Sequence, residues 1–102
     1  MSESDPVAAV RSALAEMDGA YARAIGVIEE STDLDLAFAA ANDLAAHMRS
    51  LDAAAGELRV RIVGQVWHSE RLSLAALADR IGVSKSRADQ LIRAVKKDQE
   101  QP

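Results

Sequence analysis

With 102 residues, only 3% of them aromatic and 21 of them alanine, the chain is one domain, or a small domain with an appendage, and has little material for a deep monomeric core. The absence of cysteine excludes a disulfide framework and a thiolate metal site. We see no secretory signal and no apolar run of membrane-spanning length, so we expect a cytoplasmic protein without a membrane partner.

The net charge of −4 is divided unevenly along the chain. Residues 1–57 hold three basic and eleven acidic side chains, a net −8, whereas residues 58–102 hold nine and five, a net +4. This asymmetry predicts an interaction surface for an anionic partner on the basic half, the alternative being surface charge without a role.

The first half of the chain predicts two helices joined by a short turn. After a disordered stretch at residues 1–5, Asp5 and Pro6 form a common helix start. Apolar side chains then recur in steps of three and four over about three heptads, which is the stripe of a coiled coil. Thr32 with Asp35 resembles a capping box that starts the second helix, where a second stripe begins.

Two helices of matched length over residues 6–56 favour an antiparallel, coiled-coil-like hairpin. Its alanine-rich seam is thin, so we expect two copies to form a homodimeric four-helix bundle. The alternative is a monomer whose hairpin folds back on the C-terminal part. The predicted dimerisation residues are Val10, Leu14, Met17, Tyr21, Ile28, Phe38, Leu44, Met48 and Leu51.

Beyond Gly56, an apolar face predicts a supporting helix for a C-terminal unit, with Trp67 as a core residue. Whether the chain bends at Gly56 or continues as one helix is left open by the pattern. Residues 74–93 then have the spacing of a helix-turn-helix, with Gly82 suited to a left-handed turn and Ser84 to an N-cap. We therefore expect an all-α protein whose trihelical helix-turn-helix unit covers residues 57–97, without a wing, before a disordered tail at 98–102.

The segment 58–97 carries the runs Leu72-Ser73-Leu74, Ile81-Gly82-Val83-Ser84 and Lys85-Ser86-Arg87-Ala88-Asp89-Gln90-Leu91. It resembles the region-4 helix-turn-helix of bacterial sigma factors and, more loosely, small phage, plasmid and actinobacterial regulators that share this unit. Ser86 stands where primary sigma factors carry a glutamate, Asp89 stands where a basic residue is usual, and no promoter-melting region is present. The resemblance therefore implies a regulator that uses the same DNA-reading unit, and not a working sigma factor.

In this interpretation residues 84–95 form a recognition helix in the major groove of double-stranded DNA. Lys85 and Arg87 lie in the first turn, where base contacts concentrate, and arginine suits guanine as the glutamine at position 90 suits adenine. The residues expected to contact phosphates are Arg93, Lys96 and Lys97, with the two serines that cap the helices, Ser73 and Ser84. Asp89 is expected to pair with Arg93 at i+4. The predicted DNA-binding residues are Ser73, Ser84, Lys85, Ser86, Arg87, Gln90, Arg93, Lys96 and Lys97.

The function that we expect is a homodimeric, sequence-specific transcriptional regulator associated with the nucleoid, reading an inverted repeat with half-sites about 34 Å apart. One alternative is a protein-interaction module that docks on RNA polymerase or another factor. A second is a plasmid or phage DNA segregation or transfer protein. His47 and His68 stand alone, and no catalytic motif appears, so we expect no enzyme, cofactor or metal.

Overall fold

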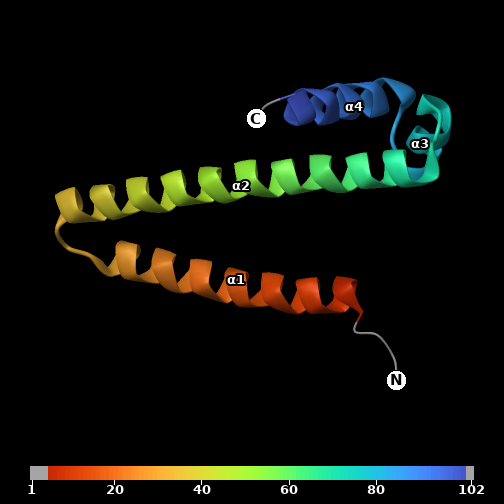
Figure 1. Ribbon diagram of the computed structural model, residues 1–102. Helices are drawn as coiled ribbons and strands as arrows, with labels where there is room; N and C mark the ends of the chain where they lie inside the picture. The colour runs from red at the N-terminus through yellow and green to blue at the C-terminus, as the bar shows by residue number, and fades with distance from the viewer. Residues whose placement is uncertain (1–4, 101–102) are drawn as a thin grey trace. The chain divides into compact units, whose positions relative to one another are not determined.

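The computed structural model describes residues 5–100, and every regular element in that range is an α-helix (Figure 1). The four helices are α1 (Pro6–Glu30), α2 (Leu34–Glu70), α3 (Leu74–Ile81) and α4 (Lys85–Glu100). The all-α class is therefore confirmed. Of the two segments expected to be disordered, residues 1–4 and 101–102 lie outside the described range.

The helix α1 begins as its sequence predicts. The Asp5 carboxylate accepts hydrogen bonds from the backbone N–H groups of Val7, at 3.0 Å, and Ala8, at 3.4 Å, and Pro6 occupies the first helical position. These bonds satisfy donors that have no partner inside the helix. Asp5 is therefore the N-cap of α1 and not part of a disordered end.

The start of α2 differs from the expected capping box. The residue that caps it is Asp33, whose Oδ1 accepts hydrogen bonds from the N–H groups of Asp35 (3.0 Å) and Leu36 (3.2 Å). Because α2 begins at Leu34, the N-cap position falls on Asp33, and Thr32 lies one residue too early. The expectation that Thr32 and Asp35 form the cap is wrong.

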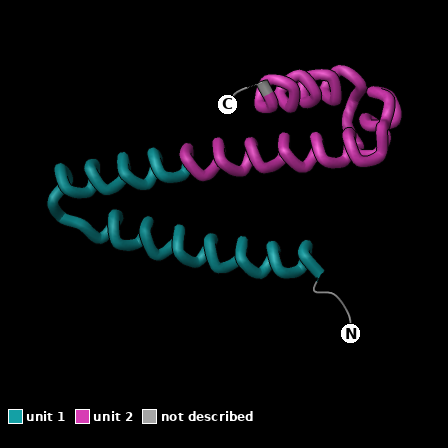
Figure 2. Tube along the Cα trace, viewed as in Figure 1, with its two compact units in different colours: residues 1–48 teal, residues 49–102 magenta. Residues whose placement is uncertain are grey.

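The helix α2 runs without interruption through Gly56, which resolves the question that the sequence left open. Its 37 residues span about 55 Å. A helical glycine costs about 1 kcal/mol relative to alanine, and the alanines directly before Gly56 are the best helix formers. The chain divides into compact units at 48/49 and not at the expected 56/57, so α2 contributes to both units (Figure 2).

The unit of residues 49–102 holds the buried core. The end of α2, all of α3 and the inner face of α4 meet there, and Leu77 and Ala88 are completely buried. Gly64 in α2 lies against Val95 in α4, where an added Cβ would be only 3.0 Å from Val95 Cγ1. The remaining buried apolar residues are Val63, Ala78, Leu91, Ile92 and Val95.

The helix α4 continues to Glu100, into the segment from residue 98 that was expected to be disordered. Val95 is buried, and the side-chain Nε2 of Gln99 lies 3.0 Å from Nε2 of His68 in α2. These contacts stabilise the last turns of α4, so the expectation of disorder is wrong for residues 98–100.

Candidate nucleic-acid interface

The connection between α3 and α4 is held by short-range hydrogen bonds. The Ser73 hydroxyl caps α3 by accepting from the N–H of Ala76 at 3.1 Å, and the Ser84 hydroxyl accepts from the N–H of Arg87 at 3.0 Å before α4. Between them Gly82 has φ 73° and ψ 35°, a left-handed backbone that glycine adopts without a steric penalty. Both serine caps and the glycine turn agree with the sequence prediction.

The same connection also satisfies the carbonyl groups at the end of α3. The N–H of Gly82 donates to the carbonyl of Asp79 at 3.3 Å, and the N–H of Val83 donates to that of Ala78 at 3.0 Å. Ala78 of α3 and Ala88 of α4 are both buried in the cluster that also holds Leu77, Leu91 and Ile92. The turn and this shared core fix the direction in which α4 leaves the turn.

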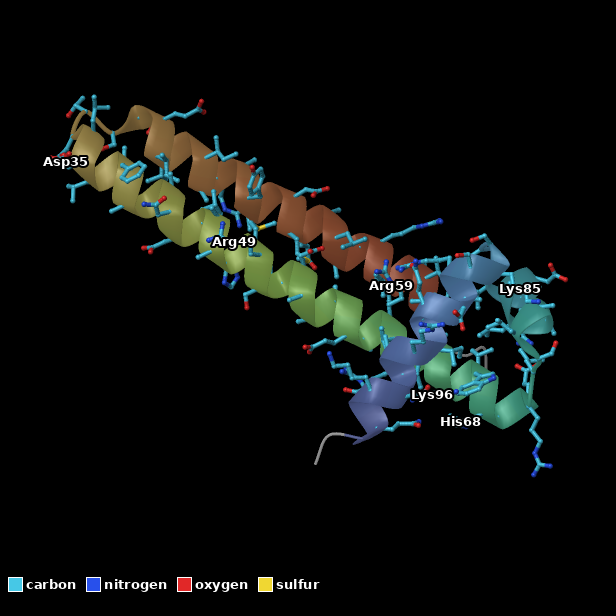
Figure 3. The ribbon with its side chains drawn as sticks, turned by 90° about the horizontal axis from the view of Figure 1, so that it is seen from above. Asp35, Arg49, Arg59, His68, Lys85 and Lys96 are labelled. Atoms are coloured by element: carbon cyan, nitrogen blue, oxygen red, sulfur yellow. The ribbon has the colours of Figure 1, made fainter. Side chains whose placement is uncertain are left out.

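The outer face of α4 is solvent-exposed and basic. One side of α4 is buried in the core, and its buried residues are Ala88, Leu91, Ile92 and Val95. A line of residues on the opposite side of the helix, in steps of four, three and four from Ser86 to Lys97, therefore lies farthest from the core. Flanking side chains widen this face at both ends of the helix, where Figure 3 labels Lys85 and Lys96. The exposed residues are Ser86, Gln90, Arg93 and Lys97 along the centre of the face, with Lys85, Arg87 and Lys96 beside them.

Two side-chain pairs organise this surface. Arg93 Nε lies 3.1 Å from Asp89 Oδ2, which is the expected i,i+4 ion pair. Arg87 Nη1 donates to Gln90 Oε1 at 3.3 Å, so these two side chains restrict each other's orientation. Asp89 is half-buried and paired, which offsets its negative charge within the basic face.

One basic side chain on this surface has a partner that the sequence did not indicate. Lys96 Nζ lies 5.7 Å from the centre of the Trp67 ring, within the range of a cation–π interaction. Trp67 packs against the core cluster, as expected, and its ring lies 4.9 Å from that of His68. Lys96 is therefore directed towards α2, on the flank of the basic face.

A second unexpected contact joins the end of α2 to α3. Arg80 Nη1 forms an ion pair with Glu70 Oε1, and this hydrogen bond, with the nearby guanidinium charge, holds the pKa of Glu70 below its usual range. The two residues lie ten positions apart in different helices, so no helical or strand spacing in the sequence predicts that they pair. Next to Glu70, Arg71 has φ 50° and is the one non-glycine residue with positive φ in the range 5–100.

The residues predicted for dimerisation lie on α1 and α2 and are far less buried than the core residues of the unit 49–102. None of α1 is buried, and Ile28 in α1 and Leu44 in α2 are half-buried. The other seven keep between 36% and 69% of their surface exposed: Val10, Leu14, Met17, Tyr21, Phe38, Met48 and Leu51. An apolar surface of this kind is typical of an interaction site.

Residues 5–100 also bear on two other kinds of site, a membrane span and a metal centre. No helix there has an apolar stretch long enough to cross a membrane. Nor do three or more histidine, aspartate or glutamate side chains in that range gather closely enough to hold a metal ion. No protein-family model, curated protein or solved structure matches the chain.

Proposed function

We propose that this chain is a sequence-specific DNA-binding protein that inserts α4 into the major groove. The observation that supports this is the outer face of α4, which is exposed, basic and directed away from the core by a turn that Gly82 and Ser84 stabilise. A helix held in this way by a preceding helix is the arrangement with which helix-turn-helix proteins read DNA. We name the unit 57–97 accordingly as a wingless helix-turn-helix.

The side chains on this face divide into two chemical groups. Arg87 and Gln90 in the first turns of α4 have the donor and acceptor geometry for guanine and adenine edges, and Ser86 permits close approach. Ser73 and Ser84 lie at helix N-termini, where hydroxyl and N–H groups suit phosphate oxygens. Lys85, Arg93, Lys96 and Lys97 supply the salt-dependent part of the affinity.

The resemblance of this unit to sigma region 4 supports a role in transcription. Because Ser86 and Asp89 differ from the sigma pattern, the proposed regulator reads its own site and not a standard promoter element. The apolar stripes of an N-terminal hairpin over residues 6–56 bring two copies together in this proposal. A dimer presents two copies of α4 to an inverted repeat in the nucleoid, with half-sites about 34 Å apart.

The test is a titration of duplex binding against salt. We expect the logarithm of the association constant to fall linearly with the logarithm of salt concentration, by about 0.9 for each phosphate neutralised. The variant Lys85→Ala/Arg87→Ala should lower the affinity for the specific site by about 1–3 kcal/mol for a lost base contact, and reduce the salt slope by about 1.

A matched control removes the same charge elsewhere. Arg23→Ala/Arg49→Ala takes two exposed arginines from α1 and α2 and should leave the specific affinity nearly unchanged. Binding that does not respond to salt, or that Lys85→Ala/Arg87→Ala leaves unaltered, would contradict the DNA-binding proposal.

The exposed apolar side chains of α1 favour a second candidate, an interaction module that docks on RNA polymerase or another factor. A chain that captures purified polymerase but shows no salt-dependent duplex binding would support this candidate. A segregation or transfer protein of a plasmid or phage would use the same DNA chemistry. Genomic footprinting distinguishes it from a regulator, because its sites would cluster at a replicon or transfer origin and not at promoters.

A further inference from the structure

The helix α1 presents one continuous apolar face to solvent. Five side chains in steps of three and four, defined here as the α1 stripe, are between 45% and 56% exposed. No residue of α1 is buried, and none belongs to the buried core cluster. The α1 stripe consists of Val7, Val10, Leu14, Met17 and Tyr21.

The two flanks of the α1 stripe differ in character. Arg11 and Asp18 lie seven residues apart on one flank, in the e positions of the heptad, and both are exposed. Ala13 and Ala20 occupy the g positions on the other flank. Neither charged side chain forms an ion pair within the described residues.

We propose that a second copy of the chain covers the α1 stripe, with the two α1 helices antiparallel. A two-fold axis between Leu14 and Met17 packs Leu14 of each copy on Met17 of the other, and Val10 on Tyr21. The same axis places Arg11 of each copy beside Asp18 of the other. One self-complementary surface therefore forms two identical ion pairs, as a two-fold interface requires.

A parallel pair does not use these charges. In a parallel coiled coil the g position of one helix faces the following e position of the other, which sets Ala13 opposite Asp18. In the antiparallel pair e faces e and g faces g, so the charges meet on one flank. On the other flank Ala13 of one copy meets Ala20 of the other, and these small side chains let the helices approach closely.

The ends of α1 supply an independent argument. Glu29 and Glu30 lie in its last turn, which holds no basic residue. Within one helix, the negative C-terminal end of the macrodipole therefore repels these two carboxylates. In the antiparallel pair they lie near the N-terminus of the other α1, whose dipole is positive. Charges that are unfavourable in one copy become favourable in two.

This inference rests on the homodimer of the proposed function and requires no DNA. Sedimentation of the full chain should give a species of twice the 10.9 kDa of one copy. Leu14→Glu, in the α1 stripe, should give a monomer, whereas Ser12→Glu, on the exposed opposite side of α1, should remain a dimer. Circular dichroism of both variants measures their helix content and so checks that Leu14→Glu still folds.

The ion pairs are tested by exchanging their charges. Arg11→Asp or Asp18→Arg alone should raise the dimer dissociation constant about three- to tenfold, because each places like charges together twice. The double variant Arg11→Asp/Asp18→Arg should restore the original dissociation constant. A failure of the double variant to recover would overturn the proposed pairing.

The orientation is tested by distance. The chain has no cysteine, so a spin label at Ser31→Cys reports one distance between the copies. The antiparallel pair separates the two labels by about 45 Å along the helix axis, at 1.5 Å per residue, whereas a parallel pair leaves them within about 20 Å. The short distance, or a monomeric wild-type chain, overturns the inference. A dimer with the long distance that fails to bind duplex instead contradicts the DNA-binding function alone.

Discussion

The position of Gly64 in α2 against Val95 in α4 makes a sharp prediction for Gly64→Ala. A Cβ at Gly64 would lie 3.0 Å from Val95 Cγ1 and 3.4 Å from Val95 Cγ2, and Val95 is only 3% exposed. Valine has a single preferred rotamer in a helix, so its methyl groups do not turn away at low cost. The new methyl group therefore has to displace α4 or distort Val95.

Two effects of opposite sign determine the result. Replacing a mid-helix glycine with alanine stabilises by about 0.8–1 kcal/mol, and overpacking a core destabilises by about 1–3 kcal/mol. The net effect for Gly64→Ala is a destabilisation of about 0–2 kcal/mol. Gly56→Ala is the matched control, because Gly56 lies in the same helix with nothing within 4 Å of its added Cβ. The Gly56→Ala substitution should raise the free energy of unfolding by about 1 kcal/mol.

Urea unfolding of both variants at one protein concentration, followed by Trp67 fluorescence, measures the difference. A third comparison isolates the contact: in a Val95→Ala background, Gly64→Ala should become stabilising, because the opposing methyl groups are gone. If Gly64→Ala stabilises as much as Gly56→Ala in the wild-type chain, Val95 does not restrict the space beside Gly64.

Four further substitutions at three positions test the unit that holds α3, α4 and the end of α2. Leu77→Ala truncates the largest completely buried side chain in residues 5–100 and should lower the free energy of unfolding in urea by about 2–5 kcal/mol; a loss below 1 kcal/mol would mean that Leu77 is not central to the core. Gly82→Ala places a Cβ on a left-handed backbone and should lower the free energy of unfolding by about 1–2 kcal/mol. Gly82→Asn should lower it by less, because asparagine adopts this conformation more readily than alanine. Equal losses of stability in the two variants would exclude backbone strain as the cause. The ion pair with Arg80 lowers the pKa of Glu70 in the folded protein. The pair therefore stabilises the fold at pH values above the pKa that Glu70 has in the unfolded chain, and this stabilisation is lost as the pH falls through the pKa of Glu70 in the folded protein. Glu70→Gln should therefore reduce the acid dependence of thermal unfolding, by a small amount since both side chains are largely exposed, and an unchanged pH profile would argue against the pair.

The all-α class and the α3–α4 turn could be predicted because their causes are local. Serine before a helix, glycine after one and apolar residues at helical spacing each act within a few residues. The caps at Ser73 and Ser84, the left-handed Gly82 and the pair of Asp89 with Arg93 follow from such rules. The exposed basic face of α4 follows as well, since burying its apolar side leaves the other side in solvent.

The sequence by itself thus determined the helices, the turn and the candidate DNA-binding face, through interactions between near neighbours in the chain. Only the tertiary structure decided that Glu70 pairs with Arg80, that Lys96 lies over Trp67 and that Gly64 lies against Val95. It also showed α2 to be continuous through Gly56, where a weak local preference for breaking the helix competed with the alanines beside it. Contacts between residues distant in the chain depend on how the helices pack, and no local spacing records that packing.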